Sequence, residues 1–311
     1  MTTDAPIRVE GLTHHYGPRA ALDGASFEVP AGEIFALLGP NGGGKTTLFR
    51  ILCTALRPVG GRALIGGLDV ATAGAAVRRM IGVVFQHPSL DAKLTVRENL
   101  RHQGHLYGLR GRRLEARIDE MLARFRVADR AADRVETLSG GLARRADLAK
   151  GLLHRPGVLL LDEPSSGLDP QARWELWQLL DASRREDGLT VLMTTHFMDE
   201  ADRCDRVGII DAGRLVAVGT PDGLKSGIAG QCLHLETDDA AGLAGAVQAR
   251  FGVRPVVLGA IVRIEHDNAH ELIPRLIESF PERIRAVALS RPTLEQVFIH
   301  HTGRRFEEQA A

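Results

Sequence analysis

The chain of 311 residues carries 39 Lys and Arg against 39 Asp and Glu, so its formal net charge is zero, and 34 of its residues are glycine. Zero net charge argues against a protein whose affinity comes mainly from a basic surface on nucleic acid, and the glycines follow no strict repeat, which excludes collagen. With 44% hydrophobic and 25% charged residues the chain can bury a large core, so wholesale disorder is excluded as well.

No apolar run approaches the roughly 20 residues that a membrane-spanning helix needs. The first six residues also lack the basic and apolar regions of a signal peptide. The three cysteines, Cys53, Cys204 and Cys232, stand far apart and form no CxxC pair, so we interpret them as small buried hydrophobic residues. The sequence therefore predicts a cytosolic protein that acts at a membrane only through a partner.

Short continuous apolar runs alternate with longer helical segments from Ile7 to about Gly219. Such runs are typical of strands buried on both faces of a parallel sheet, so the predicted fold class is α/β. Polar or glycine-rich loops follow the strands, and active sites in such sheets usually lie there. The predicted strands are Ile34–Leu38, Ile81–Phe85, Val158–Leu161, Val191–Met193 and Val207–Ile210.

Helical patterning replaces the strands over about residues 88–155, which predicts a helical insert in the α/β core. One helix is expected at Thr95–Leu109. Another is expected at Leu114–Phe125, where the apolar side chains fall on one stripe. Three arginines between these helices are interpreted as a solvated loop: Arg110, Arg112 and Arg113.

A different pattern begins after Gly219, with a turn at Thr220–Gly223 and a linker over residues 222–230. The next elements follow in the order βαββαβ, which is typical of a ferredoxin-like domain, so a small α+β domain is predicted over residues 231–303. Residues 304–311 are expected to form a frayed tail. The expected strands are Cys232–Glu236, Arg254–Leu258, Ala260–Glu265 and Ile284–Leu289, and the expected helices are Ala240–Phe251, Ala269–Phe280 and Thr293–His301.

A glycine-rich motif lies between the first predicted strand and a predicted helix. Its glycines let the backbone curl around an anion, and the helix N-terminus adds positive potential. Lys45 is placed to reach the β- and γ-phosphates of a nucleotide, and the hydroxyl of Thr46 to bind Mg²⁺. The motif satisfies the pattern G-x-x-x-x-G-K-[ST] and reads Gly39-Pro40-Asn41-Gly42-Gly43-Gly44-Lys45-Thr46.

Two acidic residues end the apolar strand Val158–Leu161. Asp162 is placed to hold Mg²⁺ through its water shell, and Glu163 can polarise an attacking water as a general base. Paired acids at a strand end could also start a turn into Pro164. With a phosphate loop in the same chain, we favour the catalytic interpretation.

Further motifs occur around these two: Leu138-Ser139-Gly140-Gly141, Gln86 after a strand, Ser166-Gly167-Leu168-Asp169 after the acids, and His196 after the strand Val191–Met193. In this order and spacing the chain resembles the ATP-binding subunit of an ABC-type transporter over about residues 7–219. The resemblance implies a P-loop NTPase core of the ABC ATPase type with a helical subdomain, an ATP-binding domain over residues 1–221, and ATP and Mg²⁺ as cofactors.

The resemblance also implies roles for single residues. Glu163 would be the catalytic base, His196 would contact the γ-phosphate and orient Glu163, and Gln86 would sense Mg²⁺ and the attacking water. Tyr16 looks like the aromatic residue that stacks on adenine, with a tyrosine on an edge strand as the alternative. Thr47 completes the phosphate-binding residues.

In the family, two such domains dimerise head to tail with ATP between them. Ser139, Gly140 and Gly141 of one copy would then close over the γ-phosphate held by the other, and Asp169 would act across the interface. The chain departs from the family pattern at two positions. Leu142 stands where Gln is common, so it is left out of the site. Gly43 stands where Ser or Ala is commoner, which should not prevent phosphate binding.

Four stretches resemble the multidrug and antibiotic-resistance (daunorubicin-type) exporter branch: residues 86–91, 94–100, 293–298 and 302–304. This implies an ATPase subunit that powers drug, antibiotic or lipid-like efflux by ATP-driven dimer closure. It would pair with a second copy and with separate membrane permease subunits at the cytoplasmic face of the plasma membrane, without nucleic acid. Two alternatives stay open: an importer ATPase whose tail binds a regulatory ligand, and a soluble non-transport ABC ATPase that acts as a switch.

Overall fold

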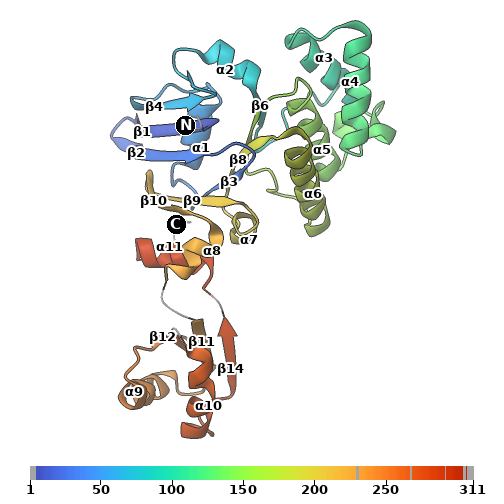
Figure 1. Cartoon of the computed structure of the whole chain (residues 1–311). Helices are drawn as coiled ribbons and strands as arrows, with labels where there is room; N and C mark the ends of the chain where they lie inside the picture. The colour runs from blue at the N-terminus through green and yellow to red at the C-terminus, as the bar shows by residue number, and fades with distance from the viewer. Residues whose placement is uncertain (1–4, 229–230, 267, 291, 304–305, 307–311) are drawn as a thin grey trace. The chain divides into compact units, whose positions relative to one another are not determined.

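The computed structural model describes residues 5–228, 231–266, 268–290, 292–303 and 306 (Figure 1). The chain divides into two compact units, and the second unit begins at Thr220. Among the described residues, no helix is both long and apolar enough to cross a membrane. All three cysteines are free and buried, which confirms their interpretation as small hydrophobic residues.

A six-stranded sheet with the order β10-β9-β3-β8-β7-β6 forms the centre of the first unit. The strands from β9 to β6 pair in parallel, and β10 is antiparallel at the edge. All five predicted apolar runs lie in this sheet, which confirms the α/β fold class. The strands are β3 (Ile34–Leu38), β6 (Ile81–Val84), β7 (Val158–Asp162), β8 (Thr190–Thr195), β9 (Arg206–Asp211) and β10 (Arg214–Gly219).

A second, antiparallel sheet in this unit has the order β2-β1-β4-β5 and was not predicted. Its long strands alternate buried and exposed residues and carry bulges, so they contain no continuous apolar run. Helix α1 packs against strands of both sheets, and residues of both sheets and α1 form one core. The elements are β1 (Ile7–Tyr16), β2 (Arg19–Val29), β4 (Gly60–Ile65), β5 (Leu68–Asp69), α1 (Lys45–Leu52) and α2 (Gly74–Met80).

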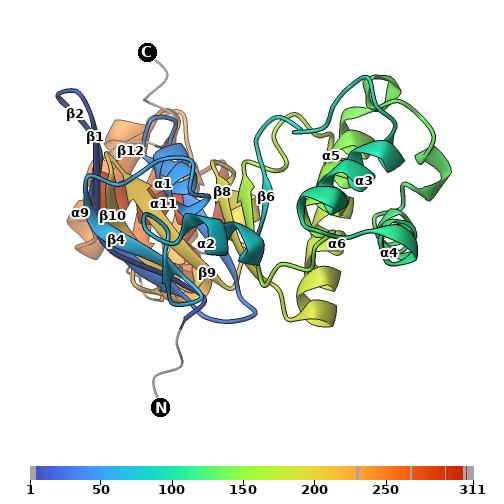
Figure 2. The ribbon, with the colours of Figure 1, turned by 90° about the horizontal axis from the view of Figure 1, so that it is seen from above.

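Helices α3 (Val96–Leu106), α4 (Gly111–Arg124) and α5 (Gly140–Gly151) form the expected helical insert. Figure 2 shows them gathered on one side of the strands β6 and β8. The predicted apolar stripe of α4 is buried. The interpretation of Arg112 and Arg113 as a solvated loop was wrong, because both lie in the first turn of α4. Helices α6 (Pro170–Asp187) and α7 (Met198–Ala201) follow later in the chain.

The second unit has the predicted βαββαβ element order. Its sheet, β12-β13-β11-β14, is antiparallel throughout, and apolar residues of the sheet and of α9 and α10 form its core. The elements are β11 (Gln231–Glu236), α9 (Ala240–Phe251), β12 (Val256–Leu258), β13 (Ile261–His266), α10 (Ala269–Ser279), β14 (Ala286–Ser290) and α11 (Leu294–Thr302).

The turn and linker expected after Gly219 are partly wrong, because helix α8 (Pro221–Ser226) occupies this stretch. The Thr220 hydroxyl accepts a hydrogen bond from the Gly223 amide at 3.0 Å, and proline at the first helical position favours a helix start. Of the remaining linker and tail, residues 229–230, 304–305 and 307–311 lie outside the described part of the chain.

Candidate functional site

Residues 39–44 connect β3 to α1 and form the predicted phosphate loop. Gly44 has φ of 110°, and a Cβ added there would lie 2.5 Å from the Ala21 carbonyl oxygen, so only glycine fits. The first amide to donate within the following helix is that of Leu48, to the Gly44 carbonyl oxygen at 3.0 Å. The amides of the first turn therefore have no partner within the helix and can receive an anion.

A cavity of about 370 Å³ opens over this loop. Tyr16, Asn41, Gly42, Gly44, Lys45, Thr46, Thr47 and Glu163 line it, all of them predicted site residues. Tyr16 is 47% exposed at the end of β1. Strand β1 is an inner strand of its sheet, but its pairing with β4 ends at Thr13, so the alternative of an edge-strand tyrosine stays open at Tyr16.

Arg19 also lines the cavity, and it was not predicted from the sequence. It pairs with Tyr16 across the β1–β2 hairpin and donates to the Gly42 carbonyl oxygen at 3.3 Å. The only available sequence signal was its position three residues after Tyr16, in a hairpin that had not been predicted.

Lys45 is buried at the base of the cavity. Its Nζ donates to the carbonyl oxygens of Gly39 at 2.8 Å and Pro40 at 3.1 Å, and lies 3.5 Å from Oε1 of Glu163. Burial lowers the pKa of the Lys45 ammonium, and the attraction of Glu163 opposes this shift. The loop carbonyls and Glu163 hold the ammonium group in place for a phosphate oxygen.

Glu163 has φ of 43°, a left-handed conformation that costs a non-glycine residue of order 1–3 kcal/mol. Its amide donates to Oγ1 of Thr194 at 3.0 Å, which helps to hold this conformation. Nε2 of Gln86 donates to Oε2 of Glu163 at 3.3 Å, and Nδ1 of His196 lies 3.1 Å from the same oxygen. The structure therefore brings the three predicted catalytic residues together at one carboxylate.

Asp162 is buried beside Glu163, and its Oδ1 accepts a hydrogen bond from Oγ1 of Thr194 at 2.6 Å. Burial raises the pKa of the Asp162 carboxyl, while the bond from Thr194 opposes the shift. Thr194 thus holds both acids, and it was not predicted from the sequence. The signal lies in the register of the parallel sheet, where Thr194 of β8 stands opposite Asp162 of β7.

The residues proposed to hold Mg²⁺ are Thr46, Gln86 and Asp162. A hydroxyl, an amide and a carboxylate offer the oxygen ligands that Mg²⁺ prefers, and Asp162 is a buried carboxylate with one side-chain hydrogen-bond donor, Thr194, among the described residues. These residues fit the ion. No group of three or more His, Cys, Asp or Glu that could hold a metal is found in the described part of the chain.

Ser139, Gly140, Gly141 and Asp169 do not lie in the cavity. The Ser139 hydroxyl caps α5 by accepting from the Leu142 amide at 3.4 Å, and Asp169 caps α6 by accepting from the Ala172 amide at 2.9 Å. A Cβ added to Gly141 would lie 3.1 Å from Cβ of Ala172, so the two helix N-termini are neighbours. These residues form a second group, in which Ser139, Gly140 and Asp169 are exposed and Gly141 is half-buried.

Arg144 of α5 was likewise not predicted from the sequence. Its buried guanidinium donates to the Phe85 carbonyl oxygen at 2.6 Å and also to the carbonyl oxygen of Gln86. Arg144 therefore ties the helix that begins at Ser139 to the backbone of Gln86.

Comparison with known proteins gives consistent results. Residues 22–166 match the family described as ABC transporter. The chain is 42% identical to the daunorubicin resistance ATP-binding protein DrrA3 of Streptomyces coeruleorubidus over 99% of both chains. It is 37% identical to the Nod factor export ATP-binding protein I of Rhizobium meliloti (strain 1021), over 97% of this chain and 89% of that protein.

Among solved structures, cbiO1 from Clostridium perfringens, part of the ABC transporter complex cbiONQ, superimposes with a TM-score of 0.67 and 29% identity. The superposition covers 80% of this chain and 96% of cbiO1.

Proposed function

The chain belongs to the ABC transporter family and is an ATPase, and on this premise we propose that it powers a membrane exporter of drug-like, antibiotic or lipid-like molecules. One observation supports the ATPase chemistry above all: Gln86 and His196 meet at the Glu163 carboxylate beside the phosphate-loop cavity. The export direction rests on full-length similarity to resistance and export proteins, which extends through the second unit.

We propose that the phosphates of ATP lie against the first turn of α1 and Lys45, with adenine on Tyr16. Glu163 then accepts the proton of the attacking water, and His196 and Gln86 orient the carboxylate and the water. Mg²⁺, held by Thr46, Asp162 and Gln86, would neutralise charge on the phosphates. Rigid contacts between these residues limit the reorganisation needed at the moment of reaction.

A second copy would complete the site. Ser139 and Gly140 are exposed and Gly141 is half-buried at the N-terminus of α5, outside the cavity, where an approaching phosphate is favoured. Asp169 is exposed at the neighbouring N-terminus of α6. In a head-to-tail dimer each copy would present this group to the nucleotide of the other. The closed dimer would move permease subunits, which hold the chain at the cytoplasmic face of the membrane.

The division of the chain into an ATP-binding domain over residues 1–221 and an accessory domain over residues 231–303 belongs to the same proposal. The first would carry every residue of the nucleotide site named above. The second would support dimerisation.

The test is a pull-down of the Glu163→Gln variant from solubilised membranes with ATP present. We expect a polytopic membrane protein to co-purify, because slow hydrolysis holds the closed dimer together, and the Lys45→Ala control to recover less of it. Co-purification with a permease that works with a periplasmic binding protein would indicate an importer instead. Soluble partners or ribosomes alone would contradict the transporter assignment.

A further inference from the structure

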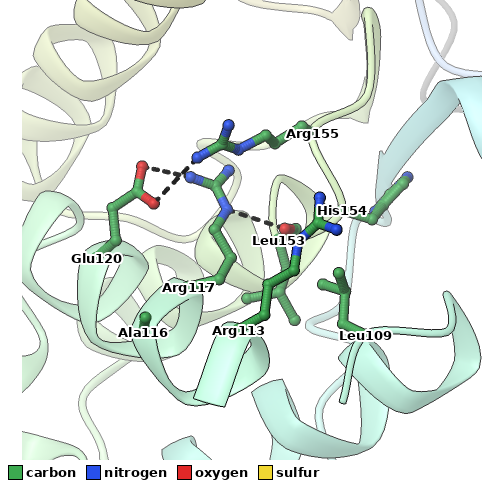
Figure 3. A pocket seen from close by; sticks show the side chains of 8 residues that line it. All are labelled: Leu109, Arg113, Ala116, Arg117, Glu120, Leu153, His154 and Arg155. Carbon is green, nitrogen blue, oxygen red and sulfur yellow. Dashed lines mark hydrogen bonds and ion pairs between the residues drawn. The ribbon is translucent and has the colours of Figure 1, made fainter. Parts of the chain in front are cut away.

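A separate cavity of about 270 Å³ lies in the helical insert, between α4 and the loop that follows α5 (Figure 3). We call it the arginine cavity, because Arg113, Arg117 and Arg155 line it together with Glu120 and His154. Arg113 and Arg117 extend from α4 toward the loop that carries Arg155. The nucleotide site described above uses none of these residues.

Positive charge predominates in the arginine cavity. Three guanidinium groups face one carboxylate, Glu120, which pairs with both Arg117 and Arg155. The other titratable residue of the lining, His154, is neutral or positive and does not offset this charge. Burial lowers the pKa of its imidazole, against the hydrogen bond with the Ile81 carbonyl oxygen. The excess positive charge favours an anionic ligand.

Arg117 is held in advance of any ligand. The residue is 8% exposed, and its guanidinium donates to the carbonyl oxygens of Leu153 at 3.0 Å and Leu152 at 2.8 Å. A third N–H group of the guanidinium donates to the Glu120 carboxylate. Of its five N–H groups, two are therefore left for a ligand. A fixed guanidinium binds an oxyanion with little loss of rotamer freedom.

Arg113 offers a second, uncommitted guanidinium. Within the described part of the chain it makes no hydrogen bond or ion pair, and its side chain is exposed at the cavity mouth. Leu109, Ala116 and Leu153 supply apolar wall, which suits a short aliphatic group. The volume lies below the roughly 300–1,000 Å³ of ordinary ligand pockets, so the ligand must be small.

From this we propose that the arginine cavity binds a small organic anion through a carboxylate or phosphate group. The anion would bridge Arg113 and Arg117 with charge-assisted hydrogen bonds, and its apolar part would rest on the leucines.

The cavity lies at the C-terminal end of α5, whose N-terminal end carries Ser139 and Gly140. The 12 residues of α5 span about 18 Å. Nε2 of His154 lies 3.0 Å from the carbonyl oxygen of Ile81, the first residue of β6, and β6 leads to Gln86. A ligand that immobilises this loop would also hold α5 in one position against β6, and with it Ser139 and Gln86. It would thereby regulate ATP hydrolysis, a consequence that rests on the proposed function.

The test is calorimetric titration of the full-length chain with inorganic phosphate and, separately, succinate, after saturation with Mg-ADP to fill the phosphate loop. We expect one or both anions to bind, and Arg113→Gln to weaken binding about tenfold or more, as loss of a charged hydrogen bond predicts. Arg112→Gln, one residue away on α4 and outside the cavity lining, should leave the affinity unchanged. The anion that binds with the higher affinity identifies the headgroup, phosphate or carboxylate.

Absence of binding by both anions would overturn the proposal, and so would an equal loss in Arg112→Gln and Arg113→Gln, which would indicate diffuse attraction. Because binding is measured without turnover, the result does not depend on ATPase activity. If the wild-type chain binds the anion but hydrolyses no ATP, only the proposed function fails.

Discussion

The phosphate-loop cavity and the group formed by Ser139, Gly140, Gly141 and Asp169 differ in how the chain holds them. At the cavity, Gln86, Glu163 and His196 follow three adjacent parallel strands, and Gln86 and His196 each lie within 3.3 Å of Oε2 of Glu163. In the other group, Ser139 and Asp169 only cap their own helices and stay exposed.

We call the phosphate-loop cavity the first half of the site and the group around Ser139 and Asp169 the second half. In the proposed function, one chain can complete only the first. Parallel strands end at the same edge of a sheet, so their register fixes the first half without help. Ser139 and Asp169 contact only amides of their own helices in the hydrogen bonds of the described residues, and both remain exposed. This arrangement is what the proposed dimer requires, in which a second copy completes this half.

The largest effect is expected from Glu163→Gln. ATP turnover should fall about 10²–10⁴-fold, because the amide cannot accept the proton of the attacking water. ATP affinity should remain, since Lys45 and the loop amides are intact. Steady-state ATPase assays and nucleotide titration check this, with the exposed residue change Glu278→Gln as control. Turnover near the wild-type rate would show that another group is the base.

A second pair of variants separates the two halves directly. Lys45→Ala should weaken ATP binding to the single chain about tenfold to a hundredfold, because charge-assisted hydrogen bonds to phosphate are lost. Ser139→Ala should leave that affinity unchanged. Nucleotide titration of both variants measures the difference.

In the Glu163→Gln background, Ser139→Ala should instead reduce the ATP-dependent dimer in sedimentation velocity experiments. If Ser139→Ala weakened binding to the monomer as much as Lys45→Ala does, Ser139 would have to reach the nucleotide of its own chain.

A smaller effect is expected from substitution of the last two glycines of the phosphate loop, Gly43 and Gly44. Gly44→Ala should destabilise the first unit by about 1–3 kcal/mol, because φ is positive there and the new Cβ would collide with the Ala21 carbonyl. At Gly43, which has no positive φ, the nearest atom to a Cβ is the Pro40 carbonyl oxygen at 3.1 Å. Gly43→Ala should therefore stay within about 1 kcal/mol of wild type. Denaturant unfolding of both variants measures the difference.

The same two halves show what sequence could predict. The buried strands could be predicted from continuous apolar runs in the sequence, and each predicted catalytic residue follows one of these runs. Tyr16 was identified only by resemblance, because its strand alternates buried and exposed residues and the surrounding sheet was not predicted.

Thr194, Arg19 and Arg144 were missed for a different reason. The role of Thr194 depends on partners 31 or more residues away through the register of a sheet, and that of Arg144 on partners 58 or more residues away through the packing of a helix. The role of Arg19 depends on the unpredicted β1–β2 hairpin and on Gly42, 23 residues away. No local pattern carries that information. Arg113 was assigned to a loop because α4 begins at Gly111, before Leu114, which is the first residue of its apolar stripe.

The smallest effect concerns the contact that joins α5 to the phosphate-binding core. Burial lowers the pKa of His154 below its ordinary value of 6.5, and nearby Arg117 lowers it further, against the bond with Ile81. The unfolded chain therefore binds a proton near pH 6.5 that the folded chain does not bind until its lower pKa is reached. The free energy of unfolding should fall as the pH drops through this window, and should not depend on His154 above it.

His154→Gln, which keeps a side-chain donor for the Ile81 carbonyl, should remove this part of the pH dependence. Denaturant unfolding of the variant between pH 5 and 8 should then show a shallower loss of stability below pH 6.5 than the wild type. Exposed His102 on α3 serves as the control, and His102→Gln should run parallel to wild type. A His154→Gln profile parallel to wild type would show that His154 binds protons equally in the folded and unfolded chain. The contact between His154 and Ile81 would then not be sensitive to pH.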